Sequence, residues 1–497
     1  MSRQEIKEPT ILNKRRAGIL LHITSLPGPG AMGDLGQEAY HFVNFLHDTG
    51  ITVWQTLPLG TTHADRSPYQ GLSAHAGNPE LISVDWLCKQ GWLRFPDMST
   101  ESKSALEYPK SFLLTKAFQG FLKRADEGNK KDFADFCQAK SSWLDDFALF
   151  MALRHKFHPQ CWNQWPEHFK EREAKALQEA RRRLKAQIDG IKFQQYVFFR
   201  QWLELKVYAG QRGVLMFGDI PIFVSYDSSD VWANRDVFKL DDAGEMVVVA
   251  GVPPDYFSET GQRWGNPHFN WDTLKKTGFH WWLDRLQTQL ELFDILRIDH
   301  FRGLEAAWEI PAYEETAING QWVKAPGQAL LSAINVALGS IPLVAEDLGI
   351  ITPEVEELRD EFHLPGMKIL QFAFGDGPDN PYLPGNYVTN CVAYTGTHDN
   401  DTTLGWSENL SDEAKTKIYD YLGNPQTSIS CALIHAALGS VANLAVIPMQ
   451  DILELGSEHR MNTPGTATGN WTWRFRWDQV TPERTEKLRD LVRLFDR

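Results

Sequence analysis

A cation and a carboxylate stand two positions apart at the end of an apolar stretch, where residues 294–302 read D-I-L-R-I-D-H-F-R. Leu296 and Ile298 alternate with Arg297 and Asp299, which is the spacing of a β-strand, so the two charged side chains share one face. A neighbouring cation favours an ionised carboxylate and lowers its pKa. An oriented, ionised Asp is what a covalent nucleophile requires, although a structural ion pair at a strand end is an equal alternative from this stretch alone.

Two further apolar stretches end in acidic residues. Residues 342–349 read P-L-V-A-E-D-L-G and reach Glu346, and residues 392–403 read V-A-Y-T-G-T-H-D-N-D-T-T and reach His398 and Asp399. Enzymes built on α/β barrels place their catalytic groups at the carboxyl ends of several strands. Three strands that each end in a carboxylate therefore predict one shared active site.

These stretches resemble the catalytic motifs of the α-amylase clan, and most closely those of the amylomaltase or disproportionating-enzyme family, the 4-α-glucanotransferases. The resemblance rests on L-R-I-D-H-F-R-G, A-E-D-L-G and T-G-T-H-D-N-D-T, and it extends through S-P-Y-Q, G-D-I-P-I-F-V and G-Q-R-W-G-N-P. It implies that Asp299 is the nucleophile and Glu346 the acid/base. It also implies that Asp399 is the third carboxylate, which holds sugar hydroxyls in the transition state.

Glycosidic transfer with retention requires an ionised carboxylate and a protonated carboxyl roughly 5–5.5 Å apart. We expect Arg297 to keep Asp299 ionised. The apolar neighbours of Glu346, together with nearby carboxylates, should raise the pKa of Glu346 and keep it protonated when substrate arrives. Asp299 and Glu346 are therefore predicted to face each other across the mouth of a barrel.

The same resemblance implies substrate-binding roles for residues outside the three strand ends. His398 resembles the sugar-hydroxyl binder of the family. Tyr69 and Trp264 resemble stacking platforms, with loop packing as the alternative for both. Asn462, in R-M-N-T-P-G, is a further candidate for a contact in the site. The full set of predicted substrate-binding residues is Tyr69, Asp219, Tyr256, Phe257, Trp264, Arg297, His398 and Asn462.

Three other acidic residues near these motifs have competing interpretations. Asp219 binds either sugar hydroxyls or the guanidinium of Arg297, and the sequence leaves both open. Asp347 should point to the opposite face of its strand from Glu346, so we interpret it as structural. Asp401 is interpreted as a turn or capping residue.

Eight apolar, strand-like stretches run along the chain, most of them separated by helical patterns. This order predicts an α/β fold, a (β/α)8 TIM barrel that forms one catalytic unit over residues 1–497. A single helix, 481–495, follows the eighth strand, so the C-terminal β-sandwich domain of most α-amylase relatives is not expected. The predicted strands are residues 17–24, 52–59, 214–223, 294–300, 342–347, 367–372, 390–397 and 443–449.

Two long stretches interrupt the alternation of strands and helices. Residues 60–190 follow the second strand and are mostly helical in pattern, which we interpret as a subdomain inserted on the barrel rim. Residues 224–280 form a second insertion, and within it residues 250–267 are a Gly/Pro-rich active-site loop that carries three aromatic residues. We expect this loop to close over the site and to shield a glycosyl intermediate from water.

The composition argues against several classes of protein. The net charge of −14 is the wrong sign for a nucleic-acid partner. Five cysteines without metal-type spacing predict reduced thiols in the cytoplasm. No signal peptide, apolar membrane-spanning run, metal motif or cofactor motif is visible. The segment before S-P-Y-Q reads T-T-H-A-D-R and lacks an aromatic residue that often supports an auxiliary glucan site in this family, which leaves such a site open.

The predicted activity is the transfer of α-1,4-glucan segments between maltooligosaccharides, which serve as donor and acceptor, by a retaining double displacement. One alternative is an α-glucan hydrolase of the same clan. The other is a non-catalytic glucan-binding protein, which would be expected to have lost one of the three carboxylates, whereas all three are present. No oligomeric state is predicted.

Overall fold

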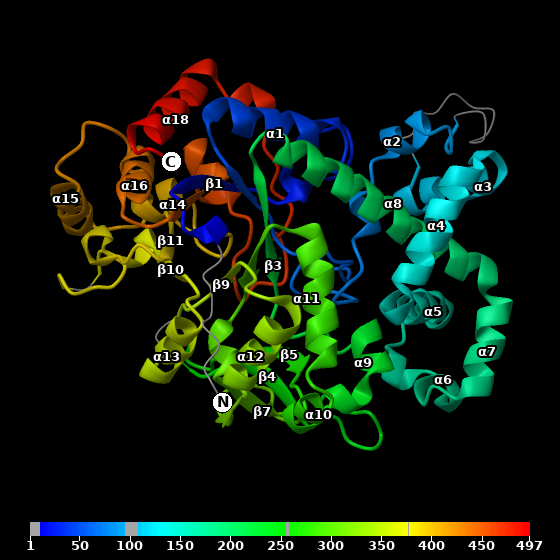
Figure 1. The fold of residues 1–497 in the computed structure, drawn as a ribbon. Coiled ribbons are helices and arrows are strands. Elements are labelled where there is room, and N and C mark those ends of the chain that lie inside the picture. The colour runs from blue at the N-terminus through cyan, green and yellow to red at the C-terminus, as the bar shows by residue number, and fades with distance from the viewer. Residues whose placement is uncertain (1–9, 95–107, 255–257, 376) are drawn as a thin grey trace.

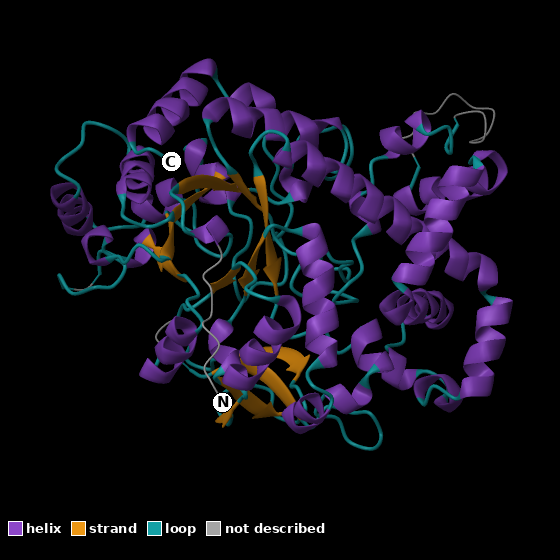
Figure 2. Ribbon diagram, in the orientation of Figure 1, coloured by secondary structure: helices purple, strands orange, loops and turns teal. Residues whose placement is uncertain are grey.

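Eight parallel strands form a nearly closed barrel at the centre of the computed structural model, which describes residues 10–94, 108–254, 258–375 and 377–497 (Figures 1 and 2). Their order around the barrel is β10-β11-β12-β1-β2-β3-β6-β9. The predicted (β/α)8 barrel is confirmed, because each strand overlaps one of the eight predicted stretches. The strands are β1 (Arg16–Leu20), β2 (Val53–Gln55), β3 (Leu215–Ile220), β6 (Ile295–Ile298), β9 (Leu343–Ala345), β10 (Gly366–Ile369), β11 (Cys391–Tyr394) and β12 (Leu444–Pro448).

The barrel strands are buried on both of their faces. Every residue of β6, β9, β11 and β12 is buried, because helices cover the outer face of a parallel barrel and side chains fill its interior. The packing is tight around Gly218 of β3, the residue before Asp219. A Cβ atom added to Gly218 would lie 2.3 Å from the ring of Phe293. A larger residue at position 218 would therefore displace either the strand or that ring.

The barrel closes between β9 and β10 through single hydrogen bonds rather than a continuous ladder. The Ala345 N–H donates to the carbonyl of Pro365 at 2.9 Å. The Met367 N–H donates to Oδ1 of Asp347 at 2.7 Å, and Arg359 donates to the other oxygen of Asp347 at 2.5 Å. Through these two bonds the buried side chain of Asp347 joins β9, β10 and the helix that carries Arg359. This agrees with the structural role predicted for Asp347.

Helices cover the outside of the barrel (Figure 1). In the described part of the chain, the segment between β10 and β11 forms only the short 3-10 helices Leu370–Phe372 and Pro384–Asn386. No described helix is both long enough and apolar enough to cross a membrane. The covering helices are α1 (Gln37–Thr49), α11 (His280–Leu292), α12 (Gly327–Leu338), α13 (Pro353–Glu361), α14 (Thr403–Glu408), α15 (Asp412–Tyr421), α16 (Ile429–Gly439), α17 (Met449–Ile452) and α18 (Pro482–Leu494).

A group of helices between β2 and β3 gathers on one side of the barrel, in cyan and blue-green in Figure 1. The long helix α8 (Lys185–Gly210) contacts α3, α4, α5 and α7. Aromatic rings fill this contact: Phe121 and Phe193 lie 5.0 Å apart between ring centroids, and Phe133 and Tyr196 lie 5.5 Å apart. The group comprises α2 (Val84–Lys89), α3 (Lys110–Arg124), α4 (Glu127–Ala139), α5 (Ser141–Phe157), α6 (Glu167–Lys170) and α7 (Ala174–Arg183).

A second, antiparallel sheet lies beside the barrel, with strand order β5-β4-β7-β8 (Figure 2). Residues 250–267 were predicted as a loop, which is wrong for the parts that form β4 and β5, and the strands β7 and β8 were not predicted. Most described residues of 250–267 belong to a hairpin, which pairs with strands from beyond the predicted insertion. None of these four strands alternates regularly between buried and exposed residues, so they carry little periodic signal. The elements are β4 (Val248–Val252), β5 (Gln262–Pro267), β7 (Ala306–Pro311) and β8 (Gln321–Lys324), with α9 (Ser229–Ala233) and α10 (Trp271–Lys276) nearby in the chain.

The seam of the barrel leads to a stability prediction. Replacing Asp347 with Ala leaves the Met367 N–H and the guanidinium of Arg359 without their buried partner, so Asp347→Ala should lower the free energy of unfolding by about 3 kcal/mol. Urea unfolding of purified variants measures this. Asp360 also contacts Arg359, at 2.8 Å, but its side chain is 65% exposed, so Asp360→Ala is the matched control and should cost less than about 1 kcal/mol. Equal losses in the two variants would contradict the role given to Asp347.

Candidate active site

The guanidinium of Arg297 lies between two carboxylates. Its Nη1 donates to both oxygens of Asp219, at 2.8 and 2.6 Å, and its Nη2 lies 2.7 Å from Oδ1 of Asp299. The register of β3 and β6 brings these groups together, because Asp219 and Arg297 are paired across the two strands. Asp299 follows two positions later on the same face, as the alternating pattern predicted.

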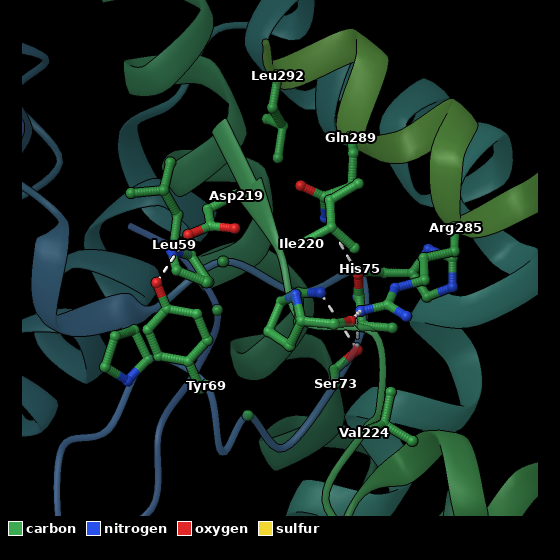
Figure 3. A pocket seen from close by; sticks show the side chains of 18 of the residues that line it. Leu59, Tyr69, Ser73, His75, Asp219, Ile220, Val224, Arg285, Gln289 and Leu292 are labelled. Atoms are coloured by element: carbon green, nitrogen blue, oxygen red, sulfur yellow. Dashed lines mark hydrogen bonds between the residues drawn. The ribbon is translucent and has the colours of Figure 1, made fainter. Parts of the chain in front are cut away.

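Tyr69 completes this group by donating its hydroxyl to Oδ2 of Asp219 at 2.7 Å (Figure 3). The side chain of Asp219 has no exposed surface. Of the two interpretations left open for Asp219, the structure therefore has it bound to Arg297, with Tyr69 as its second partner.

Glu346 lies next to Asp299 at the mouth of the barrel. Ile298 of β6 is paired with Ala345 of β9, so the two acidic residues each come one position after a paired residue. The Leu348 N–H donates to Oε1 of Glu346 at 3.0 Å, and the His300 N–H donates to Oε2 at 2.6 Å. Two backbone donors thus fix the orientation of the carboxyl group.

His300 adopts an unusual backbone conformation where it makes this contact. Its φ of 51° lies in the left-handed region, which is unfavourable for a residue with a Cβ atom and persists where the surrounding structure demands it. Burial lowers the pKa of its imidazole to about 3, so the ring is neutral at physiological pH. The backbone N–H is the part of His300 that reaches Glu346.

Burial sets the proton affinities of both carboxyls. Loss of solvation raises the pKa of Glu346 to about 8, with Arg297 opposing this rise and Asp299 adding to it. The predicted raised pKa of Glu346 therefore agrees in direction and in cause.

Asp299 differs from its prediction. Burial raises the pKa of Asp299 to about 7, although Arg297 lowers it. The expected effect of the cation is present, but the prediction of a net lowered pKa is wrong because burial outweighs the ion pair. Glu346 still has the higher pKa of the two, since Asp299 alone lies in direct contact with the guanidinium. When the two carboxyls share one proton, contact with Arg297 favours the ionised form of Asp299.

Asp399 is held by residues that follow β11 and β12. The Asn462 side chain donates to Oδ1 of Asp399 at 2.7 Å, and Nε2 of His398 lies 3.4 Å from Oδ2. Arg460 donates to the main-chain carbonyl of Asp399 at 2.9 Å. His398 stacks on Tyr69 with 5.2 Å between ring centroids. The side chain of Asp399 is 46% exposed, so these contacts orient the carboxylate and leave it open to a ligand.

A cleft of about 1010 Å³ opens over these groups. It contains the three predicted catalytic residues, and Trp264 lies on its wall with its ring edge-on to His300, 4.9 Å between centroids. Asp219 and His398 lie behind the surface of the cleft. Tyr256 and Phe257 are outside the described residues. The predicted residues on the cleft wall are Tyr69, Trp264, Arg297, Asp299, Glu346, Asp399 and Asn462.

Aromatic residues that were not predicted from the sequence also line the cleft. Trp471 follows β12 and lies 6.0 Å from Tyr69 between ring centroids. Tyr382 follows β10 and meets the ring of Phe372 edge-on at 5.5 Å. Both lie in Gly- and Pro-containing segments after a barrel strand, and that position was the available signal, since such segments form the active-site face of a barrel.

A smaller cavity of about 50 Å³ lies behind Tyr69 and Asp219 (Figure 3). Arg285 of α11 reaches its wall and donates to the carbonyls of Pro221 and Ile222, directly after β3. The volume suits one or two water molecules and is too small for a sugar ring. This region therefore supports the strand that carries Asp219 and does not extend the cleft.

The fold is a parallel barrel, and the segments at its strand ends supply three carboxylates to one cleft. These two features place the chain in the class of barrel enzymes. A family model described as 4-alpha-glucanotransferase matches residues 21–480. The chain is 49% identical to the 4-alpha-glucanotransferase of Thermus thermophilus, over 97% of this chain and 99% of the relative. It is also 49% identical to that of Synechocystis sp. (strain ATCC 27184 / PCC 6803 / Kazusa), over 98% and 99%.

A solved structure agrees with these relatives. The amylomaltase from Streptococcus agalactiae in complex with acarbose is 40% identical and superposes with a TM-score of 0.93, over 97% of this chain and 100% of that chain. The chain therefore belongs to the 4-alpha-glucanotransferase family, and the resemblance noted from its motifs is confirmed.

The contact between Asp219 and Arg297 leads to a pH prediction. Asp219 raises the pKa of Asp299 by charge repulsion, so Asp219→Asn should lower the pKa of Asp299. The acid limb of kcat/KM, where Asp299 becomes ionised as pH rises, should then move to lower pH. Asp230 is equally buried, and its carboxylate accepts the Ala74 N–H, so Asp230→Asn is the control and should leave this limb in place. An acid limb that moves to higher pH in Asp219→Asn would contradict the electrostatic argument.

Proposed function

We propose that this protein transfers α-1,4-glucan segments between maltooligosaccharides by a retaining double displacement, with Asp299 as the nucleophile and Glu346 as the acid/base. The observation that carries the proposal is the unequal pair of carboxyls on neighbouring strands. Asp299 is in contact with Arg297, and Glu346 is buried with the higher pKa. Membership of the 4-alpha-glucanotransferase family supports the substrate class.

In the first step, the Asp299 carboxylate attacks the anomeric carbon while Glu346 gives its proton to the leaving glycosidic oxygen. The ion pair with Arg297 leaves Asp299 as the unprotonated partner. In the second step, Glu346 takes the proton of an acceptor hydroxyl, and that oxygen displaces Asp299 from the anomeric carbon. Two displacements on the same carbon retain its configuration.

Asp399 would bind hydroxyls of the sugar that is being transferred. Asn462 and His398 hold the two oxygens of this carboxylate from different sides. Tyr69 and Trp264 would contact sugar rings along the cleft wall, since aromatic side chains offer flat apolar surface to the apolar face of a sugar. A fixed carboxylate beside Asp299 can hold the ring as it flattens toward the transition state, where such hydrogen bonds strengthen.

Transfer must compete with hydrolysis once Asp299 carries a glycosyl group. Water is far more concentrated than any acceptor, so an acceptor gains its advantage from being bound and oriented. A cleft of about 1010 Å³ with aromatic residues in its wall supports this, because it offers binding surface beyond the sugar that reacts. A hydrolase of the same clan is the alternative activity, and it differs by a steady gain of reducing ends.

Two organisational features belong to the same proposal. The chain would act as one catalytic barrel of residues 1–497, with an inserted, mainly helical subdomain at 60–190 and a second insertion at 224–280. A cytoplasmic location is supported by five cysteines that are all free thiols, which is the state that a reducing compartment maintains.

Maltotriose distinguishes the proposed activity from its alternative. The protein incubated with maltotriose alone should form glucose and longer maltooligosaccharides, because one molecule serves as donor and another as acceptor. Separation of the products together with a reducing-end assay measures both quantities, and total reducing ends should stay nearly constant. A steady rise in reducing ends would assign the protein to the hydrolases, and no reaction would favour a glucan-binding protein.

Glu346→Gln tests the acid/base role. The amide cannot protonate a leaving oxygen, so transfer from maltotriose should fall by roughly 10²–10⁴-fold. An α-maltosyl fluoride needs little acid help, so its burst of fluoride release should persist. For wild type with maltotriose, kcat/KM should fall as pH rises through about 8, where Glu346 loses its proton; the burst from the fluoride in Glu346→Gln should show no such fall. Equal losses with both donors would overturn the assignment.

A further inference from the structure

An exposed tryptophan on the second sheet stands at the edge of the cleft. Trp322 of β8 keeps 38% of its surface exposed, although large aromatic side chains are mostly buried in folded proteins. The guanidinium of Arg302 lies over its ring, 3.7 Å from the centroid, and Trp308 meets it edge-on at 5.3 Å. Arg302 covers one face of the indole and Trp308 packs against it, so the ring is held in place and still presents apolar surface to the outside.

The exposed surface of Trp322 faces the cleft that holds the catalytic carboxyls. Trp322 and Arg302 line this cleft together with Asp299 and Glu346. Arg302 follows Asp299 by three positions, and it donates to the carbonyl of Ile350, beyond Glu346. The indole therefore rests on a side chain that is tied to the segments after both catalytic strands, β6 and β9.

The position of Trp322 relative to Glu346 indicates which part of a glucan it would meet. Asp399 and Tyr69 follow β11 and β2 and flank Asp299, where the transferred sugar would lie. Glu346 protonates the oxygen that joins this sugar to the leaving group, so the leaving group extends past Glu346. Trp322 contacts Arg302 in the segment after β6, and Arg302 in turn bonds the segment after β9. This is the side of the leaving group and of the incoming acceptor.

We propose that Trp322, held by Arg302, is a sugar-binding platform for a glucosyl unit on the acceptor side, beyond the unit that reacts. This inference rests on the proposed function and adds a determinant of acceptor length to it. The ligand is the reducing-end side of an α-1,4-glucan chain. Its pyranose rings have apolar faces, and the indole offers a flat apolar surface in a fixed orientation, so little conformational entropy is lost on binding.

The platform makes a specific kinetic prediction. Glucose fills the reacting position of the acceptor site alone, whereas maltopentaose is long enough to reach further. Trp322→Ala should therefore raise the KM for maltopentaose as acceptor by roughly tenfold and leave the KM for glucose and kcat unchanged. α-Maltosyl fluoride serves as the donor in both assays, because its leaving group is fluoride and does not occupy the acceptor side.

Two variants serve as controls. Tyr313 lies between β7 and β8 of the same sheet and is 84% exposed, and it does not line the cleft, so Tyr313→Ala should change neither KM. Trp322→Phe keeps an aromatic face and should restore most of the affinity for maltopentaose. A role of Trp322 in packing alone would lower thermal stability and affect both acceptors alike, which would overturn the proposal.

The experiment separates failure of this inference from failure of the proposed function. Wild-type protein that only hydrolyses the fluoride, with no transfer to either acceptor, would contradict the transferase itself. Wild-type protein that transfers normally, with the same maltopentaose KM in Trp322→Ala, would leave the transferase intact and overturn the platform.

Discussion

The active site depends on one buried cation shared by two carboxylates. Arg297 is 4% exposed, and a guanidinium removed from water at this depth requires charge compensation. Asp219 supplies that compensation from the neighbouring strand, and Asp299 uses the other side of the same planar group. The guanidinium is planar, always charged and has several donors, so it can bind both carboxylates at once. The single ammonium group of a lysine could not reproduce this arrangement. The register of β3 and β6 is thereby tied to the orientation of Asp299, the proposed nucleophile.

The same burial shifts the pKa values of Asp299 and Glu346, the two carboxyls that we propose as catalytic. Low solvation raises the pKa of both Asp299 and Glu346, so burial alone would leave both protonated near neutral pH. Contact with Arg297 favours the ionised form of Asp299, and repulsion between the two carboxyls discourages ionisation of both at once. The difference between their environments supports the proposed roles of Asp299 as nucleophile and Glu346 as acid, a pattern shared by other pairs of catalytic carboxyls.

The walls of the cleft come from segments that lie far apart in the chain. Trp264 belongs to a hairpin inserted after β3, Trp322 to a strand inserted after β6, and Trp471 to the segment after β12. Asp299 and Glu346 come directly after the barrel strands β6 and β9, whereas these aromatic residues lie on the added sheet and on a connecting segment. This division allows the length and shape of the binding surface to differ among barrel enzymes while the reacting groups stay in place.

Much of the barrel was predictable because its strands are buried on both faces. Continuous apolar runs such as the one before Glu346 are a strong signal, and a carboxylate after such a run is conspicuous. The second sheet was not predictable in the same way. β5 and β8 show no alternation of buried and exposed residues. The sheet is completed by the pairing of β4 with β7, which joins distant residues such as Val248 and Pro311.

The sequence by itself determined the parallel barrel, its order of strands and the three carboxylates at the strand ends, because these follow from local periodicity and from the types of residues. Only the tertiary structure decided that Asp219 binds Arg297, that Asp347 closes the seam and that the pKa of Asp299 is raised. Each of these outcomes depends on burial and on partners from distant segments. Solvation and long-range contacts are properties of the folded chain, and no local pattern of residues encodes them.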